Sequence, residues 1–140
     1  MLNSKSLDDL LPEVAEKARA FIKMAEEELP IDELRITSTC RDYEYQTWLY
    51  AQGRTRPGII VTNAKAGYSW HNFQVAFDVV PIVDGKAVWD NAQLWKDIGE
   101  IGQECGLEWG GAWVSFKDKP HFQDTGGFNL AQLREQKATA

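Results

Sequence analysis

The two histidines of this 140-residue chain lie in two short segments that also carry acidic residues. Asp78 follows His71 by seven positions, and His121 stands three positions after Asp118. Imidazole and carboxylate are common zinc ligands, and a catalytic zinc takes about three protein ligands with one position open for water. Two histidines and one carboxylate would complete such a set. A fold that uses them must bring these distant segments together.

Length and composition favour one compact domain over residues 1–140. A chain of this size buries a sizeable core without disulfides, and 44% hydrophobic with 26% charged residues is ordinary for a globular protein. Cys40 and Cys105 form no CxxC pair, so free thiols are expected, although a bridge between them stays open. Trp95 falls in a helical pattern and is expected in the core. Trp70 and Trp113 fit either a core or a groove.

Charge and hydropathy exclude some partners. The net charge is −6, and Lys and Arg form no long cluster, so nucleic acid is not an expected partner. No apolar run approaches the roughly 18 residues of a membrane-spanning helix, and Met1–Lys5 lacks a signal-peptide core. We expect a protein made in the cytoplasm, without stable membrane association and most simply a monomer.

Periodicity predicts a small α+β fold in which helices flank an antiparallel sheet. One long helix is expected over residues 6–29, with Ser6 as its N-cap and Pro30 as its end. Further helices are expected over 43–52, 91–105 and 129–136, the last followed by a frayed tail. Strands are expected over 33–39, 74–80, 86–89, 107–109 and 121–123, with a turn at Asp84–Gly85 and a long loop over 54–68.

Asp78 conflicts with its local sequence. Strand alternation places it with Gln74 and Ala76 on one face, opposite the apolar Phe77 and Val79. Aspartate is depleted in strands, and such a conflict between residue and surroundings is expected at functional sites. The alternative is an aspartate that simply faces water.

Two further residues are candidates for catalysis. Asp118 follows a glycine-rich segment, Gly110–Trp113, that we expect to be flexible, and a carboxylate near a metal-bound water can act as general base. A plain surface turn is the alternative, since Asp-Lys-Pro is good turn chemistry. Arg41 stands between a strand and a helix, where it could bind a substrate carboxylate or an oxyanion. The alternative is an exposed ion pair with Asp42 or Glu44.

These segments resemble the motifs of the zinc D-Ala-D-Ala peptidases and of related phage endolysins. Ser69-x-His71-x6-Asp78 is similar to the family motif SxHxxGxAxD, and Asp118-x-x-His121 is similar to the second motif. The similarity spans residues 33–123 and includes Thr37–Arg41, Gln46, Leu49–Thr55, Pro57–Gly58 and Glu108–Gly111. By pattern it is strongest to the small L-alanyl-D-glutamate endopeptidases.

The resemblance implies the fold shared with lysostaphin-type enzymes and the hedgehog signalling domain. It also implies a set of roles: one zinc ion per chain held by His71, Asp78 and His121; Asp118 as catalytic base; Arg41 polarising the scissile carbonyl; and Ser69, Gln46 and Trp109 supporting the ligands or the substrate.

The chain departs from the family pattern at two positions. Gln74 replaces the motif glycine, and on the predicted strand it shares the face of Asp78 and would point toward the cleft. The expected base is aspartate rather than the glutamate of several carboxypeptidases, so it reaches one methylene less far. Neither change removes a ligand.

The leading hypothesis is a zinc-dependent peptidase that cuts the L-Ala–D-Glu bond of the peptidoglycan stem peptide. A D-Ala-D-Ala carboxypeptidase is the first alternative, although it needs a carboxylate clamp that the sequence does not locate. A non-hydrolytic zinc module and a plain wall-binding domain are alternatives of another class. The missing signal core suits a phage lysis enzyme that waits in the host cytoplasm and then acts on the cell wall in the periplasm.

Overall fold

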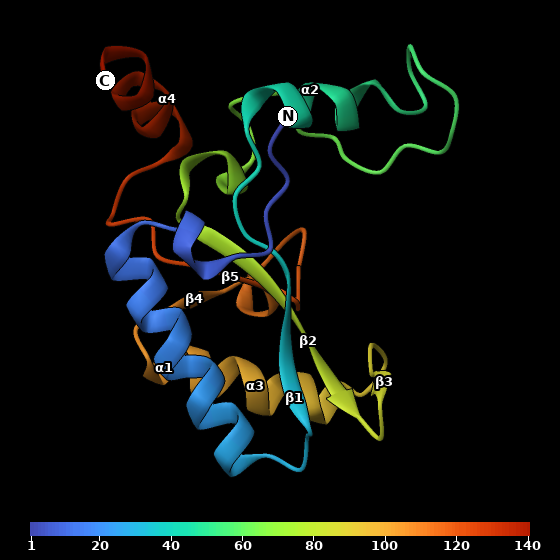
Figure 1. Ribbon diagram of the computed structural model, residues 1–140, viewed down its shortest axis with the longest axis vertical. Helices are drawn as coiled ribbons and strands as arrows, with labels where there is room; N and C mark the ends of the chain where they lie inside the picture. The colour runs from blue at the N-terminus through green and yellow to red at the C-terminus, as the bar shows by residue number, and fades with distance from the viewer.

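The computed structural model describes residues 1–140, and a five-stranded antiparallel sheet lies at its centre (Figure 1). The strands follow the order β1-β2-β5-β4, and β3 pairs with β2. The predicted α+β class with an antiparallel sheet is therefore confirmed. The bounds of the strands are β1 Glu33–Ser38, β2 Ala76–Val83, β3 Lys86–Ala87, β4 Glu108–Trp109 and β5 His121–Gln123.

Two of the four α-helices cover one face of this sheet. Phe21 of α1, Phe77 of β2 and Phe122 of β5 form an aromatic cluster, and α3 adds the buried Trp95 and Ile98 to the same core. The predicted core position of Trp95 is thus confirmed. The bounds of the helices are α1 Pro12–Glu28, α2 Tyr43–Ala51, α3 Ala92–Glu104 and α4 Leu130–Thr139, with 3-10 turns over Leu7–Asp9, Trp70–Phe73 and Gly110–Ala112.

The predicted helix over residues 6–29 is wrong at its start. Ser6 does cap a helical turn, but only the short 3-10 turn Leu7–Asp9, by accepting a hydrogen bond from the Asp8 N–H. The α-helix itself begins at Pro12. Proline fits the first position of a helix and disfavours helical geometry in the residue before it, so Leu11 is extended and separates the two segments.

The register of β2 puts Asp78 between the two other parts of the sheet. Asp78 pairs with His121 on β5 and with Ser38 on β1. Its neighbours Phe77 and Val79 are fully buried in the core, so the aspartate side chain projects from the opposite face. Pairing alone therefore brings the two histidine-containing segments close together.

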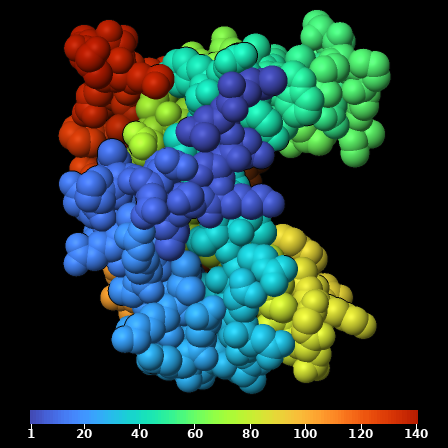
Figure 2. All heavy atoms as spheres, viewed as in Figure 1, coloured from blue at the N-terminus to red at the C-terminus, as the bar shows by residue number.

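The segment from α2 to residue 69 forms a separate feature that we call the arm. Residues 54–68 contain neither helix nor strand, as predicted. Arg54 stacks on Tyr50 and donates to the Thr62 carbonyl, and Arg56 stacks on Trp48, so the loop is attached to α2 by its arginines. Figure 2 shows the arm as a green lobe at the upper right, with an indentation below it.

Most other predicted elements are confirmed, and the differences are local. The Asp84–Gly85 turn has both residues at positive φ, as a tight hairpin requires. Cys40 and Cys105 are free thiols. The predicted frayed tail after residue 136 is wrong, because α4 continues to Thr139 behind a capping box of Asn129 and Gln132. None of the helices is long and apolar enough to cross a membrane.

Candidate metal centre

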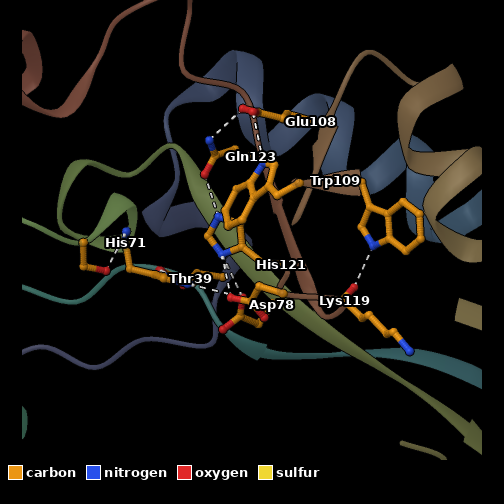
Figure 3. A network of polar contacts seen from close by, with 11 residues as sticks. Thr39, His71, Asp78, Glu108, Trp109, Lys119, His121 and Gln123 are labelled. Carbon is orange, nitrogen blue, oxygen red and sulfur yellow. Dashed lines mark hydrogen bonds and ion pairs between the residues drawn. The ribbon is translucent and has the colours of Figure 1, made fainter. Parts of the chain in front are cut away.

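Three side chains from three elements meet at one point on the open face of the sheet. Asp78 Oδ1 on β2 lies 3.3 Å from His71 Nε2 and 3.2 Å from His121 Nδ1. His71 comes from the 3-10 turn that precedes β2, and His121 begins β5. The ligand atoms of this triad all lie within 4.8 Å of one another, as a shared metal ion requires (Figure 3).

In each imidazole, the nitrogen that faces away from Asp78, here called the outer nitrogen, has a hydrogen-bond partner. Nδ1 of His71 lies 2.7 Å from the carbonyl oxygen of Thr39, and Nε2 of His121 lies 2.6 Å from Oε1 of Gln123. Both partners are acceptors, so each outer nitrogen carries the hydrogen and donates it. In the neutral rings, the inner nitrogens then present lone pairs to Asp78.

The buried Asp78 Oδ1 provides the test of fit. It has no hydrogen-bond partner, although two ring nitrogens stand about 3 Å away. Three converging lone pairs without a proton between them repel one another, and a cation relieves that repulsion. Two imidazoles and one carboxylate, each oriented by an outer contact, suit zinc and leave a position free for water or substrate. The residues present therefore fit the implied metal.

The pKa shifts of Asp78 and His121 have the same origin. Burial opposes ionisation of Asp78, but the close contacts with the rings of His121 and His71 outweigh it and hold the pKa of this carboxyl far below its usual range. Burial also disfavours a charged His121, yet the hydrogen bond and charge of Asp78 raise the pKa of that imidazole. Both shifts show that the site favours a negative Asp78 beside positive charge.

Asp118 stands at the edge of the triad and is half exposed. Its Oδ2 lies 3.9 Å from His121 Nδ1, and it is outside the group of mutually close ligand atoms. Burial and the charge of Asp78 raise the pKa of Asp118, whereas His121, His71 and Arg41 oppose this rise. A carboxylate of raised basicity beside the ligands suits proton transfer better than coordination.

Arg41 reaches the triad from the end of β1, and its alternative role as an exposed ion pair is wrong. Asp42 instead caps α2, and Glu44 pairs with the terminal amine. Nη1 of Arg41 donates to Gln46 Oε1 at 3.2 Å, while its buried Nε has no partner. Gln46 in turn donates to the carbonyl of Ala64 in the arm. Gln46 therefore holds the guanidinium in place through one of its donors.

A cavity of about 760 Å³ joins these groups. The arm forms one wall through Val61–Ala64, and the segment 113–118 forms the other. Trp70 and Trp113 both line the cavity, which answers the open question about them in favour of the groove. Its lining is Arg41, Leu49, Val61, Thr62, Asn63, Ala64, Tyr68, Ser69, Trp70, His71, Asp78, Trp113, Phe116, Asp118 and His121.

Trp109 and Ser69 lie in different surroundings. Trp109 is absent from the cavity lining; it stacks on Phe122 and donates from Nε1 to the carbonyl of Lys119. It therefore supports the segment that carries Asp118. Ser69 lines the cavity and accepts a hydrogen bond from the His71 N–H at 3.3 Å, capping the turn that presents the first histidine.

The predicted orientation of Gln74 toward the cleft is wrong. Gln74 is not part of β2 but ends the preceding turn in the left-handed region, with φ of 62°. Its side chain donates to the carbonyl of Asp9, away from the triad. A glycine adopts this backbone conformation without steric cost, which explains the glycine of the family motif. The segment from Gly110 to Ala112 likewise forms a 3-10 turn rather than the predicted flexible link.

Sequence analysis missed the groups that orient the histidines. Thr39 acts through its backbone carbonyl, which no residue type reveals. Gln123 is different, because a polar residue two positions after His121 on a fully buried strand is a signal that strand alternation could have detected. Glu108, which holds Gln123 in turn, had been noted only as part of a glycine-rich pattern.

Comparison with known proteins gives consistent relatives. Residues 62–124 match a family model described as D-alanyl-D-alanine carboxypeptidase. The chain is 40% identical over 124 residues to the peptidoglycan L-alanyl-D-glutamate endopeptidase CwlK of Bacillus subtilis (strain 168). That match covers 82% of this chain and 73% of CwlK.

Solved structures share the fold. The L-Ala D-Glu endopeptidase ChiX of Serratia marcescens superposes with a TM-score of 0.59 at 24% identity, over 85% of this chain and 83% of ChiX. The LD-carboxypeptidase LdcB also superposes with a TM-score of 0.59, at 23% identity, over 96% of this chain and 80% of LdcB. At these identities the superpositions speak for the architecture alone.

Proposed function

The chain belongs to the D-alanyl-D-alanine carboxypeptidase family of metallopeptidases, and we propose that it cuts the L-Ala–D-Glu bond of the peptidoglycan stem peptide with zinc held by His71, Asp78 and His121. One observation carries this proposal: three ligand atoms converge within 4.8 Å of one another in a cavity that Asp118 and Arg41 also line. The relative CwlK, named for this activity, supports the choice of bond.

The arrangement assigns a task to each residue. Zinc in such a site supplies a Lewis acid that makes water nucleophilic near neutral pH. Asp118 accepts the proton of the attacking water and delivers it to the departing amine, for which its raised pKa is suited. The Arg41 guanidinium, which lines the cavity, donates to the carbonyl oxygen as negative charge develops there. Gln46 keeps the guanidinium aimed by accepting from Nη1.

The charges of the cavity favour an endopeptidase over a carboxypeptidase. A carboxypeptidase needs a cation for the free terminal carboxylate of its substrate. Arg41 is the one cationic residue in the lining, and the mechanism already uses it at the scissile carbonyl. The lining extends from the arm to the segment 113–118 and so suits a chain that continues on both sides of the bond. Release of terminal D-Ala is the competing activity.

Digestion of purified sacculi by the zinc-loaded protein, followed by mass spectrometry, tests the proposal. New L-Ala carboxyl ends matched by D-Glu amino ends are expected, and both disappear with EDTA or with Asp118→Ala. Asp118→Ala should still bind zinc, because this carboxylate lies outside the triad. Glu13→Ala, an exposed carboxylate on α1, is the matched control and should digest normally. Released D-Ala instead of paired ends would establish the carboxypeptidase.

The role as a phage lysis enzyme is a further part of the proposal. It rests on the similarity to endolysins, and expression together with a membrane-pore protein tests it. Lysis that requires both the pore protein and intact Asp118 is the expected result. Lysis by this chain alone would contradict a dependence on the pore.

A further inference from the structure

A chain of three hydrogen bonds runs from the metal centre to the wall of the cleft. Gln123 Oε1 accepts from His121 Nε2 at 2.6 Å, and Gln123 Nε2 donates to Glu108 Oε2 at 2.7 Å. The second oxygen of the same carboxylate, Oε1, accepts from Trp113 Nε1 at 3.2 Å. Figure 3 shows Gln123 between His121 and Glu108, with all three side chains directed toward one another.

We propose that Gln123 and Glu108 are positioning residues that select the metal-binding tautomer of His121 and tie it to the cleft wall at Trp113. This relay, defined as His121, Gln123, Glu108 and Trp113, rests on the proposed function for the metal itself. It assigns a role to two side chains that do not line the cavity.

The direction of the relay follows from which groups can donate. A carboxylate only accepts hydrogen bonds, whereas a glutamine amide has one accepting and one donating end. Glu108 therefore requires the NH₂ group of Gln123, and the amide oxygen is left to face His121. That oxygen requires a hydrogen on Nε2. The lone pair of His121 then lies on Nδ1, the atom that faces Asp78.

Loss of Glu108 would free the amide to rotate. Its NH₂ group could then face Nε2, and His121 would carry its hydrogen on Nδ1, where it blocks the metal. Because the Gln123 side chain is 1% exposed, no water competes to correct the orientation. An acid two contacts away from the metal thus decides whether His121 is a ligand.

The Trp113 end of the relay lies at the cavity proposed for the substrate rather than at the metal ligands. Trp113 lines the cavity, and its ring lies 5.2 Å from that of His121. Its indole is held by the remaining oxygen of Glu108. One carboxylate therefore fixes both a ligand and the aromatic wall beside it, five positions before Asp118 in the chain.

A charge exchange between the two residues gives the sharpest test. Gln123→Glu alone sets two carboxylates against each other, and Glu108→Gln alone leaves one accepting oxygen for two donors. The double variant Glu108→Gln/Gln123→Glu restores all three hydrogen bonds with the net charge unchanged. Its carboxylate accepts from His121, and its amide donates to that carboxylate while accepting from Trp113.

The readouts are the zinc dissociation constant, measured by competition with a chromophoric chelator, and the visible spectrum of the cobalt-substituted protein. Gln123→Leu should weaken zinc binding about 10- to 100-fold and shift the cobalt bands. Each single exchange variant should weaken binding, and the double variant should bind more tightly than either. Trp113→Phe should leave zinc affinity within about threefold and raise KM more than it lowers kcat, because it breaks only the substrate end.

Lys17→Met is the matched control, because it breaks the ion pair with Asp124 next to β5 without touching the relay. It should lower thermal stability and leave zinc affinity and the cobalt spectrum unchanged. Gln123→Leu with the wild-type dissociation constant and spectrum overturns the relay, as does a double variant weaker than both singles. A wild-type protein that binds no zinc overturns the proposed function instead.

Discussion

The backbone N–H of Asp118 donates to the carbonyl oxygen of Gly110 at 3.0 Å, and the two residues are in such close contact that a side chain at position 110 would collide with the Asp118 carbonyl. The need for glycine here is one of space, since its φ lies outside the positive range. Asp118 in turn accepts from the His121 N–H at 3.2 Å. The expected base is therefore placed by backbone contacts on both sides.

Gly110→Ala should lower kcat by about 10- to 100-fold, because displacement of a catalytic group by about 1 Å has effects of this size. Zinc affinity should change little, since the ligands come from other positions. Steady-state kinetics and chelator competition measure the two effects. Gly85→Asn serves as control, because nothing lies within 4 Å of that site and asparagine tolerates positive φ. An unchanged kcat in Gly110→Ala contradicts the placement.

Gly102→Ala should destabilise the protein although alanine is the better helix former. The exchange gains about 1 kcal/mol in helix propensity. Its β-carbon would, however, lie 2.5 Å from the ring of Phe122 in the core, and such overpacking costs about 1–3 kcal/mol. Urea denaturation should show a net loss of roughly 1 kcal/mol. A gain in stability would mean that Phe122 moves aside freely. Gln103→Ala, at the exposed neighbouring position, should be close to neutral.

The ion pair of Lys17 with Asp124 predicts a pH-dependent stability. Burial raises the pKa of Asp124, but the Lys17 contact at 2.6 Å and the Gly126 N–H outweigh it, so the pKa is lowered. A carboxyl with a depressed pKa stabilises the fold above its unfolded pKa of about 3.9 and loses this effect as pH falls through the folded value. Lys17→Met should therefore cost about 0.5–1 kcal/mol at pH 7 and less near pH 3. Urea denaturation at both values checks this, and an equal cost at both would rule out the linkage.

Zinc should stabilise the folded chain. A ligand at about 1,000 times its dissociation constant adds roughly 4 kcal/mol, which raises Tm by on the order of 10 °C in a domain of this size. Differential scanning calorimetry with zinc and with EDTA measures the shift. His71→Ala should abolish it, whereas Glu13→Ala should retain it. A full shift in His71→Ala would place the ion elsewhere.

The fold class and the members of the triad were predicted from the sequence, and the structure agrees with both. Motif spacing named His71, Asp78 and His121, and the structure places them within 4.8 Å of one another. Strand alternation predicted that Asp78 projects opposite Phe77, and the predicted ends of two helices at residues 52 and 105 lie directly before Gly53 and Gly106, which have positive φ. The strand face and the helix ends depend on local pattern, whereas the triad was predicted from the motifs of a known family.

Features that depend on tertiary contact were not predicted. The outer partner of His71 is the backbone carbonyl of Thr39, just after β1, and the orientation of Gln123 depends on an acid fifteen positions earlier. The conformation of Gln74 has no local signal either, because glutamine rarely adopts positive φ and here a hydrogen bond to Asp9 supports it. Pro12 is itself a sequence signal that the α-helix begins there. The helical spacing of apolar residues continues through Leu10, however, and led to a predicted start at residue 6.

The position of β5 inside the sheet has a consequence for the moment at which the chain becomes an enzyme. β5 lies between β2 and β4, yet it is the last strand to be synthesised. It contributes His121, and β4 pairs with no other strand. A growing chain on the ribosome therefore carries His71 and Asp78 without the partner that closes their site. The metal site therefore closes only after β5 has left the ribosomal exit tunnel and has paired with β2.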